Sequence, residues 1–136
     1  MSDTATRTLV QQLFAKVGQG ARPEDIALLF SEEVDWFIAG DMAQVPWIGR
    51  KTGRAGVASF YQAIRDRLVS EHFELTDILA DGPRAVALGR LASRVKSTGK
   101  LIETAFAFDV TVAGGLIARF HMLEDSFAVA QAMRAD

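Results

Sequence analysis

Three side chains in this sequence are of a type and position suited to acid or base catalysis beside a pocket. His72, whose side-chain type has a reference pKa of about 6.5, precedes a predicted long strand. Asp41 lies in the loop that follows a shorter predicted strand. Glu124 has the same parity as Phe120 and Met122 along the last strand, so it can point toward the rim of a cavity that they line.

Each of these three residues also has a purely structural interpretation. His72 would be a half-exposed residue at a strand edge, and Asp41 would be a solvated aspartate in a surface loop. Glu124 would be a surface residue where the last strand frays. The residue types therefore provide candidates without assigning a catalyst.

A metal centre and a nucleophilic triad are both disfavoured. The sequence contains no cysteine, which excludes disulfides, thiol nucleophiles and zinc–thiolate sites. His121 could join Glu103 or Asp109 at a metal, but arginines are predicted beside these residues, and a metal requires several converging ligands. Ser93 and Thr104 are suited to hydrogen bonding in a pocket, and neither belongs to a Ser-His-Asp pattern. We expect no metal and no other cofactor.

Length and composition predict one domain over residues 1–136. Hydrophobic residues make up 49% of the 136 residues and charged residues 24%, as in ordinary globular proteins. The net charge of −2 and the lack of a basic segment argue against nucleic-acid binding. No apolar run is long enough to span a bilayer or to form a signal-peptide core, so we expect a cytoplasmic protein without membrane contact.

Hydrophobic periodicity predicts helices in the first half of the chain and strands in the second. Apolar residues recur at helical spacing over residues 9–17, 23–30 and 57–68, with glycine or proline at the boundaries. A short strand is predicted at 34–38, and residues 39–52 are expected to be irregular. Long strands are predicted at 84–96, 101–112 and 116–124, separated by turn-forming residues. This order predicts helices packed on one face of an antiparallel sheet.

The two predicted hairpins define which residues face each other. A two-residue loop at 98–99 would place Leu91 opposite Phe106 and Arg94 opposite Glu103. A three-residue loop at 113–115 would place Phe108 opposite Phe120, Phe106 opposite Met122, and Asp109 opposite Arg119. A two-residue loop there would turn Arg119 and His121 toward the core, which is costly for unpaired charges.

This arrangement predicts one apolar and one charged face of the sheet. The apolar face, which the helices should cover, carries Leu91, Ser93, Val95, Ile102, Thr104, Phe106, Phe108, Val110, Phe120 and Met122. The charged face, which is left to water or to a partner subunit, carries Arg90, Arg94, Glu103, Asp109, Arg119 and His121.

Aromatic and small polar residues at inward positions are the candidate ligand contacts. Trp36 and Trp47 flank the loop expected at the mouth of a pocket, and an indole offers stacking area and one N–H donor. The predicted ligand-binding residues are Trp36, Ile38, Trp47, Tyr61, Ser93, Thr104, Phe106, Phe108, Phe120 and Met122. The alternative is that the aromatic side chains among them simply fill a core.

Several short segments, taken in order, resemble a known superfamily. They are Val-Asp-Trp at 34–36, Val-Pro-Trp-Ile-Gly at 45–49, Gly-Arg-Ala-Gly-Val at 53–57, Ser-Thr-Gly-Lys at 97–100 and Leu-Glu-Asp at 123–125. With this order and spacing the chain resembles the NTF2-like superfamily, and within it the SnoaL-like and ketosteroid-isomerase-like proteins. The resemblance implies an α+β fold in which N-terminal helices pack on a strongly curved antiparallel sheet that forms a cone, a cystatin-like α+β barrel.

The catalytic residues that the resemblance implies are missing from this chain. A ketosteroid isomerase has an Asp base, a Tyr and a protonated Asp, and the corresponding positions here hold Ile38, Gln11 and Phe108. The last-strand Asp of SnoaL-like cyclases and of limonene-epoxide-hydrolase-like sites corresponds to Met122. Asp35 and Asp125 occupy family-typical positions, and we interpret them as structural residues that accept turn or cap hydrogen bonds.

Two functions remain open at the level of the sequence. In the first, the cone binds a small hydrophobic molecule, such as a carbonyl compound or an epoxide, and acts on it as an isomerase, lyase or hydrolase. In the second, the same cone is a non-catalytic binding or dimerisation module. In either case the charged sheet face, with Ala92, Ala105 and Ala107 between its charges, is expected to form a homodimer contact.

Overall fold

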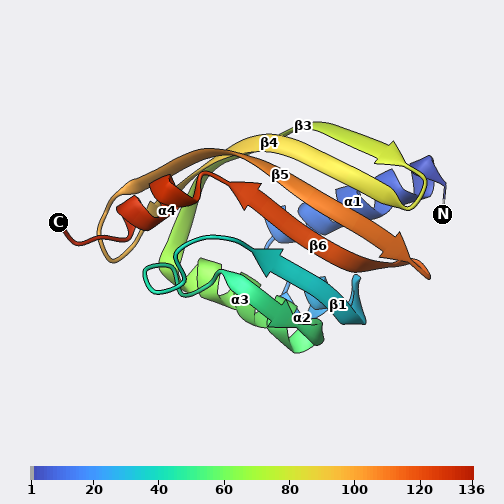
Figure 1. Ribbon diagram of the computed structural model, residues 1–136, viewed down its shortest axis with the longest axis horizontal. Helices are drawn as coiled ribbons and strands as arrows, with labels where there is room; N and C mark the ends of the chain where they lie inside the picture. Colours follow the sequence, from blue (N-terminus) through green and yellow to red (C-terminus); the bar gives the residue numbers. More distant parts are fainter. Residues whose placement is uncertain (1) are drawn as a thin grey trace.

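The computed structural model describes residues 2–136, which form a six-stranded sheet with four helices (Figure 1). The helices are α1 (Asp3–Gly18), α2 (Pro23–Ala27), α3 (Gly53–Arg67) and α4 (Ser126–Ala132). The strands are β1 (Phe30–Ile38), β2 (Gly49–Thr52), β3 (Leu68–Asp81), β4 (Arg84–Val95), β5 (Leu101–Ala113) and β6 (Leu116–Glu124). Their order in the sheet is β2-β1-β6-β5-β4-β3.

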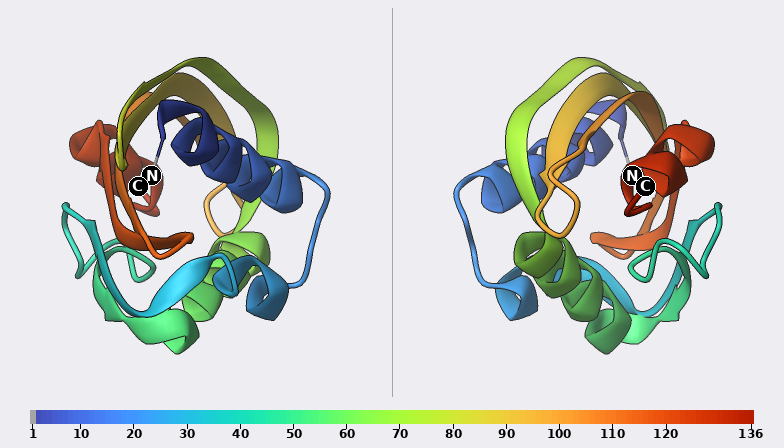
Figure 2. Two further views of the ribbon diagram at one scale, coloured as in Figure 1. Left: turned by 90° about the vertical axis from the view of Figure 1, so that its right-hand side faces the viewer. Right: turned by 90° about the vertical axis from the view of Figure 1, so that its left-hand side faces the viewer.

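The sheet curls around its own concave face, as the end-on views in Figure 2 show. Helix α1 lies inside the curl, and α2 and α3 lie at its open side beneath β1. The predicted α+β class and the strong curvature are confirmed. The sheet is mixed, because β1 pairs in parallel with β6, and it does not close into a barrel, because β2 and β3 are its two edges.

Local sequence signals account for the starts of the first two helices. The Ser2 side chain accepts a hydrogen bond from the backbone N–H of Ala5 at 3.0 Å, and Asp3 lies in the positive first turn of α1. Pro23 occupies the first turn of α2. Helix α2 is shorter than predicted, because Phe30 begins strand β1 and is buried there instead of completing the helical stripe.

The sequence prediction missed α4 and β2. Asp125 caps α4 by accepting a hydrogen bond from the backbone N–H of Ala128 at 3.1 Å, which confirms its predicted capping role. Helix α4 has only seven residues, too few for a clear apolar period. Strand β2 has four residues, and it pairs with β1 at the edge of the sheet in the segment predicted to be irregular.

Both hairpin registers differ from the predicted ones by two residues. The β4–β5 connection is longer than two residues, so Gly89, not Leu91, lies opposite Phe106. The β5–β6 loop has two residues, and a bulge after Thr111 restores the facing of the strands, so that Met122, not Phe120, lies opposite Phe108. A shift of two residues leaves every side chain on its original face, because strand side chains alternate with period two.

The predicted division of the sheet into an apolar and a charged face is therefore confirmed. Ile102, Thr104, Phe106, Phe108 and Val110 along β5 are all buried, whereas the residues between them are half-buried or exposed. The changed register does alter the ion pairs. Arg94 lies opposite Leu101 rather than Glu103, and it pairs instead with Glu71 of β3 at 2.7 Å. Asp109 lies opposite His121, yet it still accepts a hydrogen bond from Arg119 at 2.7 Å.

One glycine permits the close approach of β3 and β4 where the sheet bends. Gly89 is buried, and a Cβ atom added to it would lie 2.0 Å from the backbone oxygen of Glu74 and 2.6 Å from the Phe106 ring. Strand β3 has a bulge between Leu75 and Asp77 at this level. Any larger residue would have to push a backbone carbonyl away, so this position requires glycine.

We expect Gly89→Ala to lower the free energy of unfolding by about 1–3 kcal/mol, the usual cost of overpacking. Gly18→Ala is the control, because an added Cβ there meets nothing within 4 Å and Gly18 ends a helix without a positive φ. Urea denaturation of both variants checks this expectation. Equal stability of Gly89→Ala and wild type would contradict the close approach.

Candidate functional site

A cavity of about 320 Å³ lies on the concave side of the sheet. Its walls come from the apolar sheet face and from helices α1, α3 and α4, together with the loop that carries Trp47. The lining residues are Phe14, Val17, Gly18, Ile38, Trp47, Phe60, Tyr61, Ile64, Leu68, Ser70, Phe73, Leu91, Ser93, Ile102, Phe108, Met122, Glu124 and Val129. A cavity of this size and apolar character suits a small organic molecule.

The sheet contributes lining residues at every second position. Leu91 and Ser93 lie two residues apart on β4, and Met122 and Glu124 lie two residues apart on β6. The helices contribute at helical spacing, with Tyr61 and Ile64 three residues apart on α3. The strand alternation and the helical period therefore converge on one space.

Four of the ten predicted ligand-binding residues lie elsewhere in the core. Ile38, Trp47, Tyr61, Ser93, Phe108 and Met122 line the cavity, whereas Trp36, Thr104, Phe106 and Phe120 do not. Trp36 is fully buried and stacks on Phe120 with ring centroids 4.6 Å apart. The Thr104 hydroxyl accepts a hydrogen bond from the backbone of Asp125 at 2.8 Å and donates one to the carbonyl of Ala105 at 2.7 Å.

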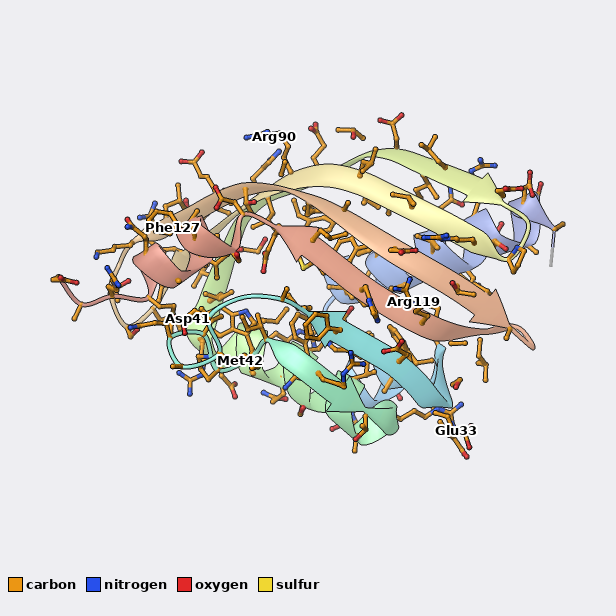
Figure 3. The ribbon with its side chains drawn as sticks, in the orientation of Figure 1. Glu33, Asp41, Met42, Arg90, Arg119 and Phe127 are labelled. Atoms are coloured by element: carbon orange, nitrogen blue, oxygen red, sulfur yellow. The ribbon has the colours of Figure 1, made fainter. Side chains whose placement is uncertain are left out.

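His72 and Asp41 both lie outside the cavity. His72 precedes β4 as predicted, and it lies exposed within the edge strand β3, beside a bulge and opposite Ala92. Asp41 is exposed in the loop after β1, where its carboxylate accepts a hydrogen bond from the backbone N–H of Ala43 at 3.1 Å. Figure 3 shows Asp41 beside Met42 in this loop. Of the three candidate acids and bases, only Glu124 reaches the cavity.

Glu124 is a half-buried carboxyl without a partner in the part of the chain that the structure describes. Its side chain takes part in no hydrogen bond or ion pair among residues 2–136. Burial, with a smaller contribution from the negative charge of Asp125, raises the pKa of Glu124 to about 7. Both protonation states are therefore populated near neutral pH, as proton transfer requires.

Tyr61 adds an uncharged donor to the cavity. Its side chain is 4% exposed, and burial raises the pKa of its phenol above the ordinary value, so the hydroxyl stays protonated. No other side chain or backbone group among residues 2–136 makes a hydrogen bond with this hydroxyl. Tyr61 can therefore donate a hydrogen bond to a bound molecule.

Several lining residues were predicted only as core. Phe14, Val17, Phe60 and Ile64 belong to the apolar stripes of α1 and α3, whereas Phe73 of β3 had no predicted role. The spacing of the helical residues indicates a buried face, but it does not show whether a residue packs against other side chains or lines a cavity. Ser70 and Phe73 are partly open to solvent and place the β3 wall near the cavity entrance.

The convex face of the sheet carries a network of paired charges. Asp35 accepts one hydrogen bond from Arg50 at 2.8 Å and contacts the ring of His121 at 3.0 Å. The bond with His121 is the main cause that holds the pKa of Asp35 below its usual range. The other ring nitrogen of His121 lies 3.1 Å from Arg119, which Figure 3 shows on the outer side of β6. Asp35 is thus an ion-pair residue, not the turn or cap residue predicted.

Within residues 2–136, no group of three or more His, Asp or Glu side chains is placed to hold a metal ion. The possible metal ligands His121 and Asp109 instead contact arginines. Across the same residues, no helix combines the length and hydrophobicity needed to cross a membrane.

Comparisons with known proteins agree with this architecture. Residues 10–120 match the family model of SnoaL-like domains. A crystal structure of an NTF2-like protein from Burkholderia xenovorans is 26% identical, with 98% of this chain and 99% of that chain covered and a TM-score of 0.89. No curated protein matches the sequence.

Two more distant structures of the same fold hold small molecules. TerC, co-crystallised with polyporic acid, is 18% identical, with 95% of this chain and 98% of that chain covered and a TM-score of 0.81. A protein with a ketosteroid isomerase-like fold from Catenulispora acidiphila, in complex with trimethylamine, is 14% identical. There, 85% of this chain and 83% of that chain are covered, with a TM-score of 0.68.

The raised pKa of Glu124 predicts a specific pH dependence of stability. The folded protein holds the Glu124 proton more tightly than the unfolded chain, so stability falls as the pH rises from 4.5 to about 7. Glu124→Gln cannot ionise, and we expect it to exceed the wild type by about 2–3 kcal/mol above this range and to match it below. Urea denaturation across this pH range measures the difference.

Glu103→Gln on the exposed face of β5 is the matched control, and it should show no such pH-dependent gain. A constant difference between Glu124→Gln and the wild type at all pH values would contradict the buried, unpaired state of Glu124.

Proposed function

Because the chain belongs to the family of SnoaL-like domains, we propose that it binds a small, largely apolar molecule in the cavity and that Glu124 exchanges a proton with this molecule. The observation that carries the proposal is one unpartnered carboxyl, with a pKa of about 7, in an otherwise apolar cavity of about 320 Å³. The small molecules bound by TerC and by the Catenulispora protein support the use of this fold for ligand binding.

The residues around Glu124 are suited to acid–base chemistry on a bound molecule. A group with a pKa near the working pH can both accept and return a proton, as an isomerase or lyase requires. Tyr61, Ser93 and Trp47 line the same cavity and can donate hydrogen bonds to an oxygen that gains negative charge. The same acid or base could activate water in a hydrolase.

The alternative function is non-catalytic binding by the same cavity. It is favoured by the apolar residues Ile38, Phe108 and Met122, which line the cavity at positions where the resemblance implies acids or bases. The two functions differ in what Glu124 does after binding. In a non-catalytic binding module, substitution of Glu124 would abolish no reaction, because the protein catalyses none.

We expect a panel of hydrophobic ketones, lactones and epoxides to contain ligands that raise the melting temperature of the wild type. Ser93→Phe should abolish this shift, because the larger side chain fills the cavity that Ser93 lines. Ser97→Phe, in the exposed β4–β5 loop, is the control and should retain the shift. Equal shifts in both variants would contradict the proposed site.

Turnover of any responsive compound then separates the two functions. Glu124→Gln should reduce kcat by about a hundredfold or more, the usual contribution of general acid–base catalysis. His72→Ala and Asp41→Ala should retain full activity, because neither residue lines the cavity. Unchanged turnover in Glu124→Gln would exclude the acid–base role and leave the binding role.

We further propose that two copies associate through the convex face of the sheet. Leu123 is 62% exposed on this face, opposite the half-buried Ala107. The charges nearby are already paired within one chain, as Asp109 is with Arg84 and Arg119, which lowers the cost of covering them.

Light scattering after gel filtration should therefore give twice the chain mass of 14.8 kDa for the wild type and the single mass for Leu123→Glu. Leu28→Glu is the control, because Leu28 is similarly exposed, at 58%, but lies at the end of α2. A monomeric wild type, or a dimeric Leu123→Glu, would contradict this interface.

A further inference from the structure

The only charged side chain that lines the cavity is an acid, Glu124. Only Tyr61 and Glu124 among the lining residues can titrate, and none is a lysine, arginine or histidine, although the chain contains 15 Lys and Arg residues and two His. Asp125, next to Glu124 in the chain, adds a second negative charge. A carboxylate or phosphate ligand would find no counter-charge here and would be repelled by Glu124.

Aromatic rings make up much of the remaining wall. The aromatic lining residues are Phe14, Trp47, Phe60, Tyr61, Phe73 and Phe108. Phe14 packs against Phe108 and Phe73, with ring centroids 5.1 Å and 5.6 Å apart, and Phe60 packs against Tyr61. The face of an aromatic ring is electrically negative and attracts a cation, and walls of this kind recognise ammonium groups in proteins.

Glu124 has an unmet requirement that a cation would satisfy. Its half-buried side chain lines an otherwise apolar cavity, and no protein donor or cation among residues 2–136 bonds to its carboxylate. A bound N–H⁺ group would supply both a hydrogen bond and a counter-charge. A neutral ligand would supply no counter-charge, so burial would continue to favour the protonated carboxyl.

We propose that the ligand of this cavity is a hydrophobic amine that binds as its ammonium ion, with the nitrogen at the carboxylate of Glu124 and the apolar body among the aromatic rings. This inference rests on the proposed function, because it specifies the class of molecule that the same cavity takes. Binding of such an amine includes a proton transfer. A protonated Glu124 gives its proton to the nitrogen of a neutral amine, which leaves a carboxylate and an ammonium ion with no change in total charge.

An isosteric pair of probes tests the charge alone. N,N-dimethylbenzylamine and isobutylbenzene have almost the same shape, but only the first carries a basic nitrogen, and phenylacetate is the anionic comparison. At about pH 8 the alkylamine is protonated and Glu124 is ionised. Calorimetry on the wild type should show the amine binding about tenfold or more tightly than isobutylbenzene, and no binding of phenylacetate.

Two further measurements assign the effect to Glu124. Glu124→Gln should lower the affinity for the amine about tenfold and leave the affinity for isobutylbenzene within about twofold, with Glu103→Gln as the control. In the wild type near pH 7, calorimetry in buffers of different ionisation enthalpy should show release of about half a proton per amine bound. That proton comes from Glu124, and a purely structural role of this residue would release none.

The outcomes separate this inference from the proposed function. If isobutylbenzene binds and the amine binds no more tightly, or if Glu124→Gln leaves the affinity for the amine unchanged, the amine inference is overturned while the cavity remains a ligand site. The absence of proton release would overturn it equally, without the need for a folded variant. If neither probe binds the wild type, both the amine inference and the proposed ligand site fail.

Discussion

The curl of a single sheet around its own concave face is the constraint on which the rest of this structure depends. Strands β3 to β6 are long, and every second residue on them faces inward, so the curl gathers apolar side chains from four strands around one interior. The bend requires a β3–β4 approach so close that only Gly89 fits. Helices α1 and α3 cover this interior without filling it, and the cavity is the space that remains.

The same curl explains why Glu124 lowers the stability of the fold when it ionises and why it is available to a bound molecule. Strand alternation places it on the inner face after Phe120 and Met122, and α4 begins directly beyond it. Its carboxyl is therefore held in an apolar space with no protein partner in the described chain, which costs stability when it ionises. Such a carboxyl is expected where a bound molecule supplies the missing partner. Functional sites often lower the stability of a protein, because their groups are arranged for a ligand and not for the empty fold.

Much of the fold could be predicted from the sequence because local signals were consistent. The apolar stripes of α1 and α3 and the alternation along β5 each indicated the correct element and the correct buried face. The errors were in features that depend on neighbours. The β5–β6 bulge moved Met122 opposite Phe108, and the seven-residue α4 is stabilised by its Asp125 cap and by burial of Val129. Neither a bulge nor a helix of only seven residues has a strong period in the sequence.

The candidate site shows the same division. The sequence by itself determined that this chain has a sheet with one apolar face and that Glu124 shares the parity of that face, because side-chain alternation is a property of the strand alone. Only the tertiary structure decided that Glu124 reaches the cavity while His72 and Asp41 do not, and that Trp36 packs in the core while Phe14 and Phe60 face the open space. Those distinctions depend on how far the sheet curls and where the helices stop covering it, which no local pattern encodes.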